Sequence, residues 1–232
     1  MIKVFYSDSY SELEKNVSCI GFFDGVHTGH QKLISRTIQD AKKKGLKAYA
    51  ITFSCDPLTL IKGPQKQISD LNDRFELFER FGLDGVIVLN FTAEMMQLDH
   101  KEFVKKYLLN MKIEEIVCGF DFHYGFKGLG SAETLKDDGE SSFDSVIIDQ
   151  QSIDGIKVSS TLIKQCLEKG DVHKANELLG YTYFIHGYNS NSPLKEGKYL
   201  TSDKTVIYYS SAMADSSRIE LISRIEDDTC HH

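Results

Sequence analysis

The sequence predicts an α/β protein with a mostly parallel sheet covered by helices, followed by a small β-rich appendage. Short β-branched runs alternate with longer stretches of helical apolar spacing, which is typical of βαβ units. Beyond Gly180 the sequence becomes rich in Ser, Asn, Tyr and Thr, and only strand-like runs remain. The 232 residues suffice for one domain of ~100–200 residues plus a smaller piece.

The first half of the chain supplies three expected strands and two expected helices in alternation. Val17–Phe22, Ala48–Phe53 and Gly85–Phe91 are short apolar runs and predict strands. His30–Lys44 and Asp70–Phe81 carry apolar residues at spacings of three and four, and a glycine follows each stretch. We therefore expect two amphipathic helices that connect parallel strands.

The second half continues the alternation and then changes. His100–Met111 predicts a helix, Ile113–Gly119 and Ser145–Ile148 predict strands, and two further helices are expected at Ser159–Leu167 and Val172–Leu179. These elements complete a sheet whose ligands should bind beyond the carboxyl ends of its strands.

The appendage is expected to hold short strands at Val206–Tyr209 and Ile219–Ile225. We place the domain boundary in the region 180–186, which gives one domain over 1–183 and a β-rich tail over 184–232. A tail of this size is too small for a robust core of its own.

Composition argues against several classes of partner. The 34 acidic and 27 basic side chains give a net charge of −7, which does not attract a phosphate polymer. No window approaches the ~20 apolar residues of a membrane span, and the N-terminus lacks the apolar core of a signal peptide. The five cysteines form no C-x-x-C pair. We expect a cytoplasmic protein with reduced thiols that binds neither nucleic acid nor membranes; His231 and His232 are read as tag residues and excluded.

The most informative stretch is Gly21–Gln31, GFFDGVHTGHQ, directly after the first expected strand. Its glycines allow close approach of a ligand to the backbone. The following helix begins with unpaired N–H groups and a positive dipole end, which suit an anion. His27 and His30 are three residues apart and so project to one side of the first turn. Two imidazoles at this place favour a polyphosphate site.

Each of the two histidines also has a plainer interpretation. A single histidine is usually structural, but a second one in register within a glycine-framed loop favours function. No cysteine or further histidine stands at zinc-ligand spacing. No Gly-Lys-Ser/Thr follows, so the loop is not a Walker A motif.

Four segments together resemble the prokaryotic FAD synthetase family of nucleotidylyltransferases, whose members are often bifunctional riboflavin kinase/FMN adenylyltransferases. The segments are GFFDGVHTGHQ at 21–31, TFSCDP at 52–57, GFDFHYG at 119–125 and VSSTLIK at 158–164. They occur in the family's order, and the resemblance extends over roughly residues 15–185. It implies a Rossmann-like nucleotidylyltransferase sheet.

The resemblance also implies site residues. It assigns the ATP site to Gly21, Phe22, Phe23, Asp24, Gly25, His27, Gly29, His30, Gly119, Ser159, Ser160, Thr161 and Lys164, with His27, His30 and Lys164 as the catalytic set. It assigns the flavin site to Phe53, Asp56, Pro57, Asp121 and Phe122. Mg²⁺ is expected to arrive with ATP, held by phosphates and water rather than by a protein-built metal site.

The expected reaction is Mg²⁺-dependent transfer of AMP from ATP to FMN, giving FAD and pyrophosphate. Two alternatives stay open: a nucleotidylyltransferase with another phosphorylated acceptor, and a non-catalytic regulator that binds flavin or nucleotide. Oligomeric state is not predicted.

The sequence departs from the family pattern in three places. Lys164 stands for an arginine and loses its bidentate fork, and Leu162 stands where a second arginine is common. Asp56-Pro57 is followed by Leu58 rather than the usual His-Pro, whereas GFDFHYG at 119–125 resembles the family's Gly-x-Asp/Asn-Phe-x-Phe-Gly segment. The tail begins like a riboflavin kinase at Ile185–Gly187, but 188–193 lack the Pro-Thr-Ala-Asn motif of that domain. We read the tail as a degenerate remnant without kinase activity.

Other polar residues receive plain interpretations. Arg74 and Glu76 are expected on a solvated helix face, and Asp137, Asp138 and Glu140 in a solvated acidic loop. Phe75, Phe78 and Phe81 have core spacing. Cys118 and Cys166 are expected to be buried small hydrophobic residues.

Overall fold

The computed structural model describes residues 2–186, 192–201, 204, 206–209 and 218–225 of the chain. The chain divides into two compact units. The N-terminal unit contains Met1–Gln65 and Leu71–Gln151, and the C-terminal unit contains Lys66–Asp70 and Ser152–His232. The boundary expected at 183/184 remains a prediction, and the tail residues 188–191 lie outside the described part.

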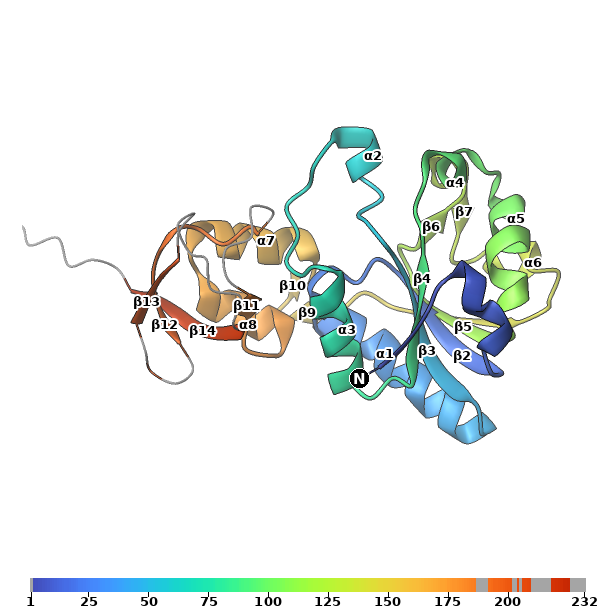
Figure 1. Cartoon of the computed structure of the whole chain (residues 1–232), viewed down its shortest axis with the longest axis horizontal. Helices are drawn as coiled ribbons and strands as arrows, with labels where there is room; N and C mark the ends of the chain where they lie inside the picture. Colours follow the sequence, from blue (N-terminus) through green and yellow to red (C-terminus); the bar gives the residue numbers. More distant parts are fainter. Residues whose placement is uncertain (1, 187–191, 202–203, 205, 210–217, 226–232) are drawn as a thin grey trace, which may run out of the picture. The chain divides into compact units, whose positions relative to one another are not determined.

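A six-stranded parallel sheet forms the centre of the N-terminal unit (Figure 1). Its strands follow the order β1-β4-β3-β2-β5-β8, and every neighbouring pair is parallel. Their bounds are Lys3–Phe5 (β1), Asn16–Ile20 (β2), Lys47–Phe53 (β3), Gly85–Leu89 (β4), Ile113–Gly119 (β5) and Asp144–Ile148 (β8). Every residue of β2 and β4 is buried, as expected for strands covered on both faces. The predicted α/β class is confirmed.

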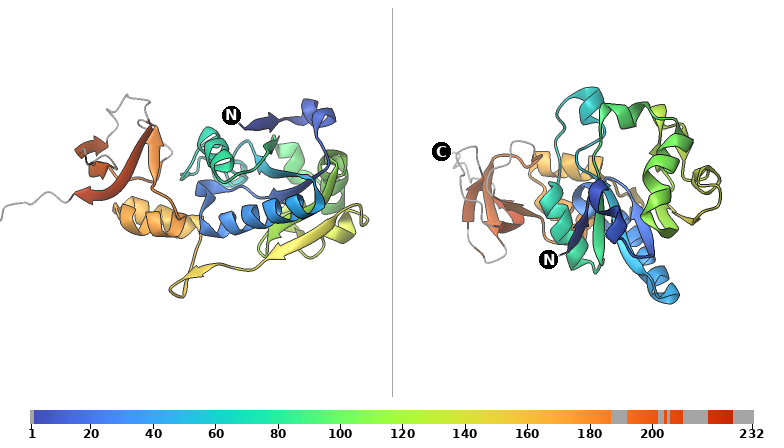
Figure 2. Two further views of the ribbon diagram at one scale, coloured as in Figure 1. Left: turned by 90° about the horizontal axis from the view of Figure 1, so that it is seen from below. Right: turned by 45° about the vertical axis from the view of Figure 1, so that its right-hand side comes forward.

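Helices cover both faces of this sheet. Right-handed crossovers place α1 (Thr28–Lys44) and α3 (Leu71–Arg80) on one face, since both connect strands in the direction of β4. The connections that run toward β8 place α5 (His100–Phe103) and α6 (Leu135–Asp138) on the other (Figures 1 and 2). The sheet lies between these two layers.

The sequence predicted one regular helix over His100–Met111, but the structure shows a composite. After α5 the chain forms a π-helical turn at Val104–Leu108 and a 3₁₀ turn at Leu109–Met111. Val104, Leu108 and Met111 are buried in the hydrophobic core together with Ile116 of β5. The apolar spacing predicts that these residues are buried, but it does not predict the change from α-helix to π-helix and 3₁₀ helix.

Smaller elements follow the strands. The two short helices α2 (Thr59–Lys62) and α4 (Ala93–Gln97) come after β3 and β4. Strands β6 (His123–Tyr124) and β7 (Gly130–Ser131) pair as an antiparallel hairpin just after β5. Because these segments follow the carboxyl ends of parallel strands, they belong to the edge at which such sheets bind ligands.

The C-terminal unit consists of two helices and antiparallel strands. Its elements are β9 (Ser152–Ile153), β10 (Ile156–Lys157), α7 (Ser160–Lys169), α8 (Val172–Leu179), β11 (Phe184–His186), β12 (Gly197–Thr201), β13 (Val206–Tyr209) and β14 (Arg218–Ile225). The last four strands form a sheet in the order β11-β14-β12-β13. The predicted β-rich appendage is confirmed, and β11 and β12 are additions to it.

Helix α8 is tied to the tail strands through one side chain. The amide nitrogen of Asn176 donates to the carbonyl of Leu221 on β14 at 3.0 Å, and its oxygen accepts from the N–H of Tyr183 at 2.7 Å. The backbone N–H of Lys195 also donates to the carbonyl of Leu167 at the end of α7, at 3.1 Å. Residues of β14 and of the segments beside the tail strands therefore satisfy polar groups of the two helices.

The cysteines and the helices bear on two further expectations from the sequence. Cys19, Cys55, Cys118 and Cys166 are free thiols, and the predicted burial of Cys118 and Cys166 is confirmed. Cys230 lies outside the described residues, as do His231 and His232. Within the described part of the chain, no helix combines the length and apolar character that crossing a membrane requires.

We predict that Asn176→Ala weakens the C-terminal unit, because it leaves the Leu221 carbonyl and the Tyr183 N–H without their partner. Each buried polar group left unsatisfied costs ~1–3 kcal/mol. Denaturant unfolding with hydrogen exchange resolved by segment measures the effect. His173→Ala on the exposed side of the same helix is the matched control, with an expected change within ~0.5 kcal/mol. Equal protection in β14 for both variants would contradict the prediction.

Candidate active site

The loop after β2 is tightly folded and carries most of the residues assigned to ATP. It forms a single 3₁₀ turn at Asp24–Val26, where Gly25 has φ of 75°. Phe23 also adopts a left-handed backbone, with φ of 60°, and its buried ring packs edge-on against Phe78 of α3. A bulky residue holds this conformation only where its surroundings require it, and such places are common at functional sites.

His27 and His30 meet at the first turn of α1. His27 is the N-cap residue, and its Nδ1 accepts the backbone N–H of His30 at 3.3 Å. The two imidazole rings are stacked, with centroids 3.6 Å apart and an interplanar angle of 14°. The predicted common orientation of the pair is therefore present, and the capping role of His27 is an additional finding.

Burial keeps both histidines neutral. It lowers the pKa of His27 to about 4, against the opposing effect of a backbone hydrogen bond. Burial, and then the neighbouring His27, hold the pKa of His30 well below its usual value. Because Nδ1 of His27 accepts a hydrogen bond, the proton of the neutral ring resides on Nε2. His27 thus presents an N–H donor, while Nδ1 of His30 is buried without a hydrogen-bond partner among the described residues.

Gly29 is required by the same arrangement. A Cβ atom at this position would lie 3.1 Å from Cε1 and 3.2 Å from Nδ1 of His27. Any side chain would therefore press on the imidazole that caps α1. The His-x-Gly-His spacing thus places the N-terminus of α1, capped by His27, beside the two rings.

Arg74 was expected on a solvated helix face, and this expectation is wrong. The side chain is only 1% exposed. Its guanidinium donates to the carbonyl of Phe22 at 2.7 Å, to Oγ1 of Thr52 at 2.8 Å and to the carbonyl of Phe53 at 3.2 Å. It also lies 4.6 Å from the ring centroid of Phe22. Arg74 therefore connects the loop assigned to ATP with the strand end assigned to flavin.

A sequence signal for Arg74 did exist. It shares the three-and-four spacing of Leu71, Phe78 and Phe81, so it stands on the apolar side of α3. An arginine inside such a stripe is buried only when its donors find partners. Here Phe78 is fully buried, as its core spacing predicted, whereas Phe75 and Phe81 are partly buried.

The residues assigned to flavin have different surroundings. Phe53 is buried and packs edge-on against Phe91. Asp56 is buried too, and its Oδ1 accepts the N–H of Leu58 at 2.8 Å, which closes a local turn. Asp121 is exposed and Phe122 is half-buried on the segment between β5 and β6. The structure thus gives Asp56 a structural task that the sequence did not suggest.

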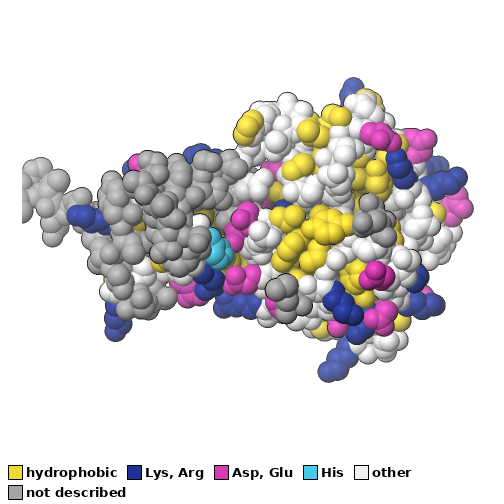
Figure 3. Space-filling model, in the orientation of Figure 1, with side chains coloured by type: hydrophobic (Ala, Val, Ile, Leu, Met, Phe, Trp, Pro, Cys, Tyr) yellow, Lys and Arg dark blue, Asp and Glu magenta, His cyan; other side chains and the backbone are white. Residues whose placement is uncertain are grey.

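Exposed apolar side chains follow Pro57. Leu58, Leu60 and Ile61 have exposed fractions of 44%, 44% and 63%, and Figure 3 shows hydrophobic side chains on the surface around α2. More of them gather in the middle of this face of the N-terminal unit, while charged side chains lie mostly toward its margins. Apolar surface beside the segment assigned to flavin suits a flat aromatic ring.

The remaining ATP assignments lie in the C-terminal unit, at the start of α7. Ser159 is the N-cap residue, and its hydroxyl accepts the N–H of Leu162 at 3.3 Å. Ser160, Thr161 and Lys164 follow on the first turns, where Thr161 is exposed and the other two are partly buried. Their assigned roles remain predictions.

In the N-terminal unit, the sheet brings several assigned residues to one edge. The loop at Gly21 follows β2, Phe53 ends β3, and Gly119 ends β5. Because β2 pairs in parallel with both β3 and β5, the three strand ends are neighbours.

Asp138 was expected in a solvated loop, and this too is wrong. It ends α6 and is only 7% exposed. Its Oδ2 accepts hydrogen bonds from the hydroxyl of Tyr124 at 2.5 Å and from Nδ1 of His100 at 2.6 Å. Asp137 and Glu140 are exposed, as expected. The cluster of acidic residues in the sequence did not show that Asp138 alone among these three is buried and hydrogen-bonded to Tyr124 and His100.

We predict that Arg74→Met lowers the free energy of unfolding by about 2–4 kcal/mol, since it leaves the buried carbonyls of Phe22 and Phe53 with fewer donors. Arg80→Met on the exposed end of α3 is the matched control, with an expected effect within ~0.5 kcal/mol. Chemical denaturation of both variants is the measurement. Equal stability of the two would remove Arg74 from this role.

Comparison with known proteins agrees with these segments. The sequence profile of the FAD synthetase family matches residues 9–162. A bifunctional riboflavin kinase/FMN adenylyltransferase of Listeria monocytogenes is 36% identical over 184 residues, which cover 78% of this chain and 58% of that protein. The Bacillus subtilis protein of the same name is 36% identical over 179 residues, covering 76% and 57%. The chain thus spans less than two thirds of the length of these bifunctional relatives.

A protein named FAD synthetase, also from Listeria monocytogenes, is 33% identical over 77% of this chain and 74% of its own length. Among solved structures, a macrolide-efflux protein from Streptococcus pneumoniae has a TM-score of 0.81 at 23% identity, covering 99% of this chain and 92% of that one. This last likeness concerns the fold alone. The family profile and the relatives, together with the four matched segments, show that this chain belongs to the FAD synthetase family.

Proposed function

We propose that the protein is an FMN adenylyltransferase, which transfers AMP from ATP to the phosphate of FMN and releases pyrophosphate. The observation that carries the proposal is the stacked pair His27 and His30 at the N-terminus of α1, inside the segment that matches the family. A phosphate oxygen of FMN attacks the α-phosphorus of ATP, and the bond from that phosphorus to the pyrophosphate oxygen breaks.

The chemistry requires positioning and charge stabilisation rather than a strong base. The FMN phosphate is already anionic at neutral pH, so it needs no deprotonation. Neutral His27 donates from Nε2, and the positive end of the α1 dipole stabilises a neighbouring anion without bringing a fixed charge. Donors held in place by the fold are effective where charge develops in the transition state. An incoming polyphosphate would raise the pKa of both imidazoles.

For the β- and γ-phosphates we propose Ser159, Ser160, Thr161 and Lys164, which stand at the start of α7. The helix N-terminus and a lysine in its first turns suit an anion. Lys164 would neutralise a phosphate as a point charge. Mg²⁺ belongs to the proposal as the metal that ATP carries, and it would neutralise phosphate charge. The described residues contain no group of three or more His, Cys, Asp or Glu side chains able to hold it by themselves.

For the flavin we propose the segments that follow β3 and β5. Phe53, Pro57 and Phe122 offer apolar surface to the isoalloxazine ring, and the exposed carboxylate of Asp121 offers a hydrogen-bond acceptor. Asp56 would act mainly by closing the turn that presents Pro57 and Leu58. Arg74 holds the backbone of Phe53 in place.

We further propose that riboflavin kinase activity is absent. Residues 188–193 lack the Pro-Thr-Ala-Asn motif. The described tail strands form a four-stranded sheet, in which β14 bonds to α8, and Lys195 just before β12 bonds to α7. Support of these helices is the task that we assign to the tail.

The substrate prediction is that FMN with ATP and Mg²⁺ yields FAD and pyrophosphate, whereas riboflavin with ATP yields no FMN. Chromatographic separation of the flavins measures both reactions. Formation of FMN at a comparable rate would refute the assignment of the tail. Absence of FAD, with pyrophosphate released from ATP and another phosphorylated acceptor, would favour the alternative transferase.

We also predict that His27→Asn and His30→Ala each lower kcat by a factor of about 10²–10³, as expected for one lost transition-state donor. Asparagine at position 27 keeps an N-cap acceptor, so the helix start is preserved while the imidazole is removed. Fluorescence titration should show nearly unchanged FMN affinity. His173→Ala, an exposed histidine, is the control. Turnover near that of the control would make the pair structural.

A further inference from the structure

Three segments of the N-terminal unit converge on the carboxylate of Asp138, a residue assigned neither to ATP nor to flavin. Oδ2 of Asp138 accepts from Tyr124 in the β6–β7 hairpin and from His100 at the start of α5. The Tyr124 hydroxyl also lies 3.1 Å from Oγ1 of Thr134, just before α6. Burial raises the pKa of Asp138, but the hydrogen bonds from Tyr124 and His100 outweigh it and lower the pKa overall. The carboxylate therefore stays ionised as an acceptor at neutral pH.

The backbones of the hairpin and of α5 also approach each other closely. A Cβ atom on Gly125 would lie 2.5 Å from Cα of His100, and one on Gly130 would lie 2.6 Å from the Tyr124 ring. The N–H of Phe126 donates to the carbonyl of Leu98 at 2.6 Å. The hairpin is thus held against the start of α5 both by backbone contact and by the Asp138 hydrogen bonds.

The Tyr124 hydroxyl stands where the resembling segment Gly-x-Asp/Asn-Phe-x-Phe-Gly has Phe. A buried hydroxyl is costly unless it is hydrogen-bonded. Tyr124 is 5% exposed and meets that requirement through Asp138 and Thr134. The buried Asp138 carboxylate therefore supplies the hydrogen-bond acceptor that the Tyr124 hydroxyl requires.

Tyr124 contacts a residue assigned to flavin. The Tyr124 ring stacks on Phe122, with centroids 5.6 Å apart and an interplanar angle of 23°. Phe122 in turn closes a turn with Gly119 through its N–H at 3.0 Å. A displacement of Tyr124 would therefore move Phe122 and its neighbour Asp121.

We propose that Asp138, Tyr124 and His100 are positioning residues that hold the β6–β7 hairpin in the conformation that binds the flavin ring. This inference rests on the proposed function. The three residues act through Phe122 and Asp121, so they should set the affinity for FMN and leave the adenylyl-transfer step and the KM for ATP unchanged.

The test compares four variants of the full chain for FMN dissociation constants without ATP, and for KM and kcat with ATP. Asp138→Leu removes the acceptor and should weaken FMN binding about tenfold, the size of one buried hydrogen bond. Asp138→Asn keeps an acceptor oxygen and should restore most of the affinity. Tyr124→Phe should cause a smaller loss, and Tyr124→Phe with Asp138→Leu should be less than additive.

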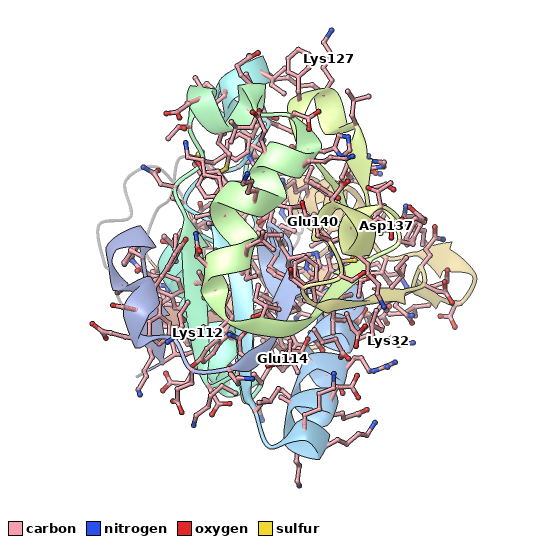
Figure 4. All side chains as sticks on the ribbon, turned by 90° about the vertical axis from the view of Figure 1, so that its right-hand side faces the viewer. Lys32, Lys112, Glu114, Lys127, Asp137 and Glu140 are labelled. Carbon is pink, nitrogen blue, oxygen red and sulfur yellow. The ribbon has the colours of Figure 1, made fainter. Side chains whose placement is uncertain are left out.

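Asp137→Leu on the same helix is the matched control and should leave FMN binding unchanged. Asp137 is exposed and lies at the outside of α6 (Figure 4). If Asp138→Leu does not fold, Tyr124→Phe decides, because Phe fits the family pattern at this position. A Tyr124→Phe or Asp138→Leu protein with lowered melting temperature but unchanged FMN affinity and KM would overturn the proposal.

The two proposals fail in different ways. A parent protein that binds FMN with the predicted variant dependence but makes no FAD would refute the proposed reaction and support the positioning role. If the parent makes FAD and all variants keep its KM for FMN, the proposed reaction is supported and the positioning role is refuted. A parent that neither binds nor converts FMN would overturn both.

Discussion

The hydrogen bonds of the Arg74 guanidinium are the constraint on which the rest of the site depends. Loops that leave parallel strands carry backbone carbonyls that the sheet no longer satisfies. Arg74 donates to the carbonyl of Phe22, which follows β2, to the carbonyl of Phe53, which ends the neighbouring β3, and to the Thr52 hydroxyl. Thr52 itself donates to Phe22 at 3.1 Å. One buried side chain thus fixes the spacing between the loop assigned to nucleotide and the segment assigned to flavin.

The alternation of strands and helices could be predicted because burial leaves a different mark on each. Strands β2 to β5 are buried on both faces and read as continuous apolar runs, whereas helices α1, α3, α7 and α8 bury one side and carry apolar residues at spacings of three and four. The ends of these elements differ from expectation by only a few residues. Strand β1 (Lys3–Phe5) could not be found this way, since three residues show no period. The π-helical turn after α5 keeps helical apolar spacing, so it too is invisible in the pattern.

For the site, the sequence predicted where residues lie along the fold but not their atomic contacts. Spacing placed His27 and His30 on one side of a helix start, but the stacked rings and the capping bond depend on atomic packing. Arg74 and Asp138 were both misjudged because a charged residue type was taken to mean exposure. The apolar spacing of α3 indicated the side on which Arg74 lies, but the hydrogen-bond partners of both side chains become visible only in the fold. The family profile ends at residue 162, before Lys164, so the departure from arginine there falls outside the matched range.

The parallel stacking of His27 and His30 has a consequence for the chemistry of metals. The lone pair of an imidazole nitrogen lies in the plane of its ring, and two histidines that chelate one ion must direct their lone pairs to a common point. Rings stacked 3.6 Å apart at 14° direct theirs nearly parallel. His27 has moreover committed Nδ1 to the helix cap. The pair is therefore a poor chelator of zinc, nickel or copper, so adventitious metal would not compete for the phosphate contacts proposed for these two histidines.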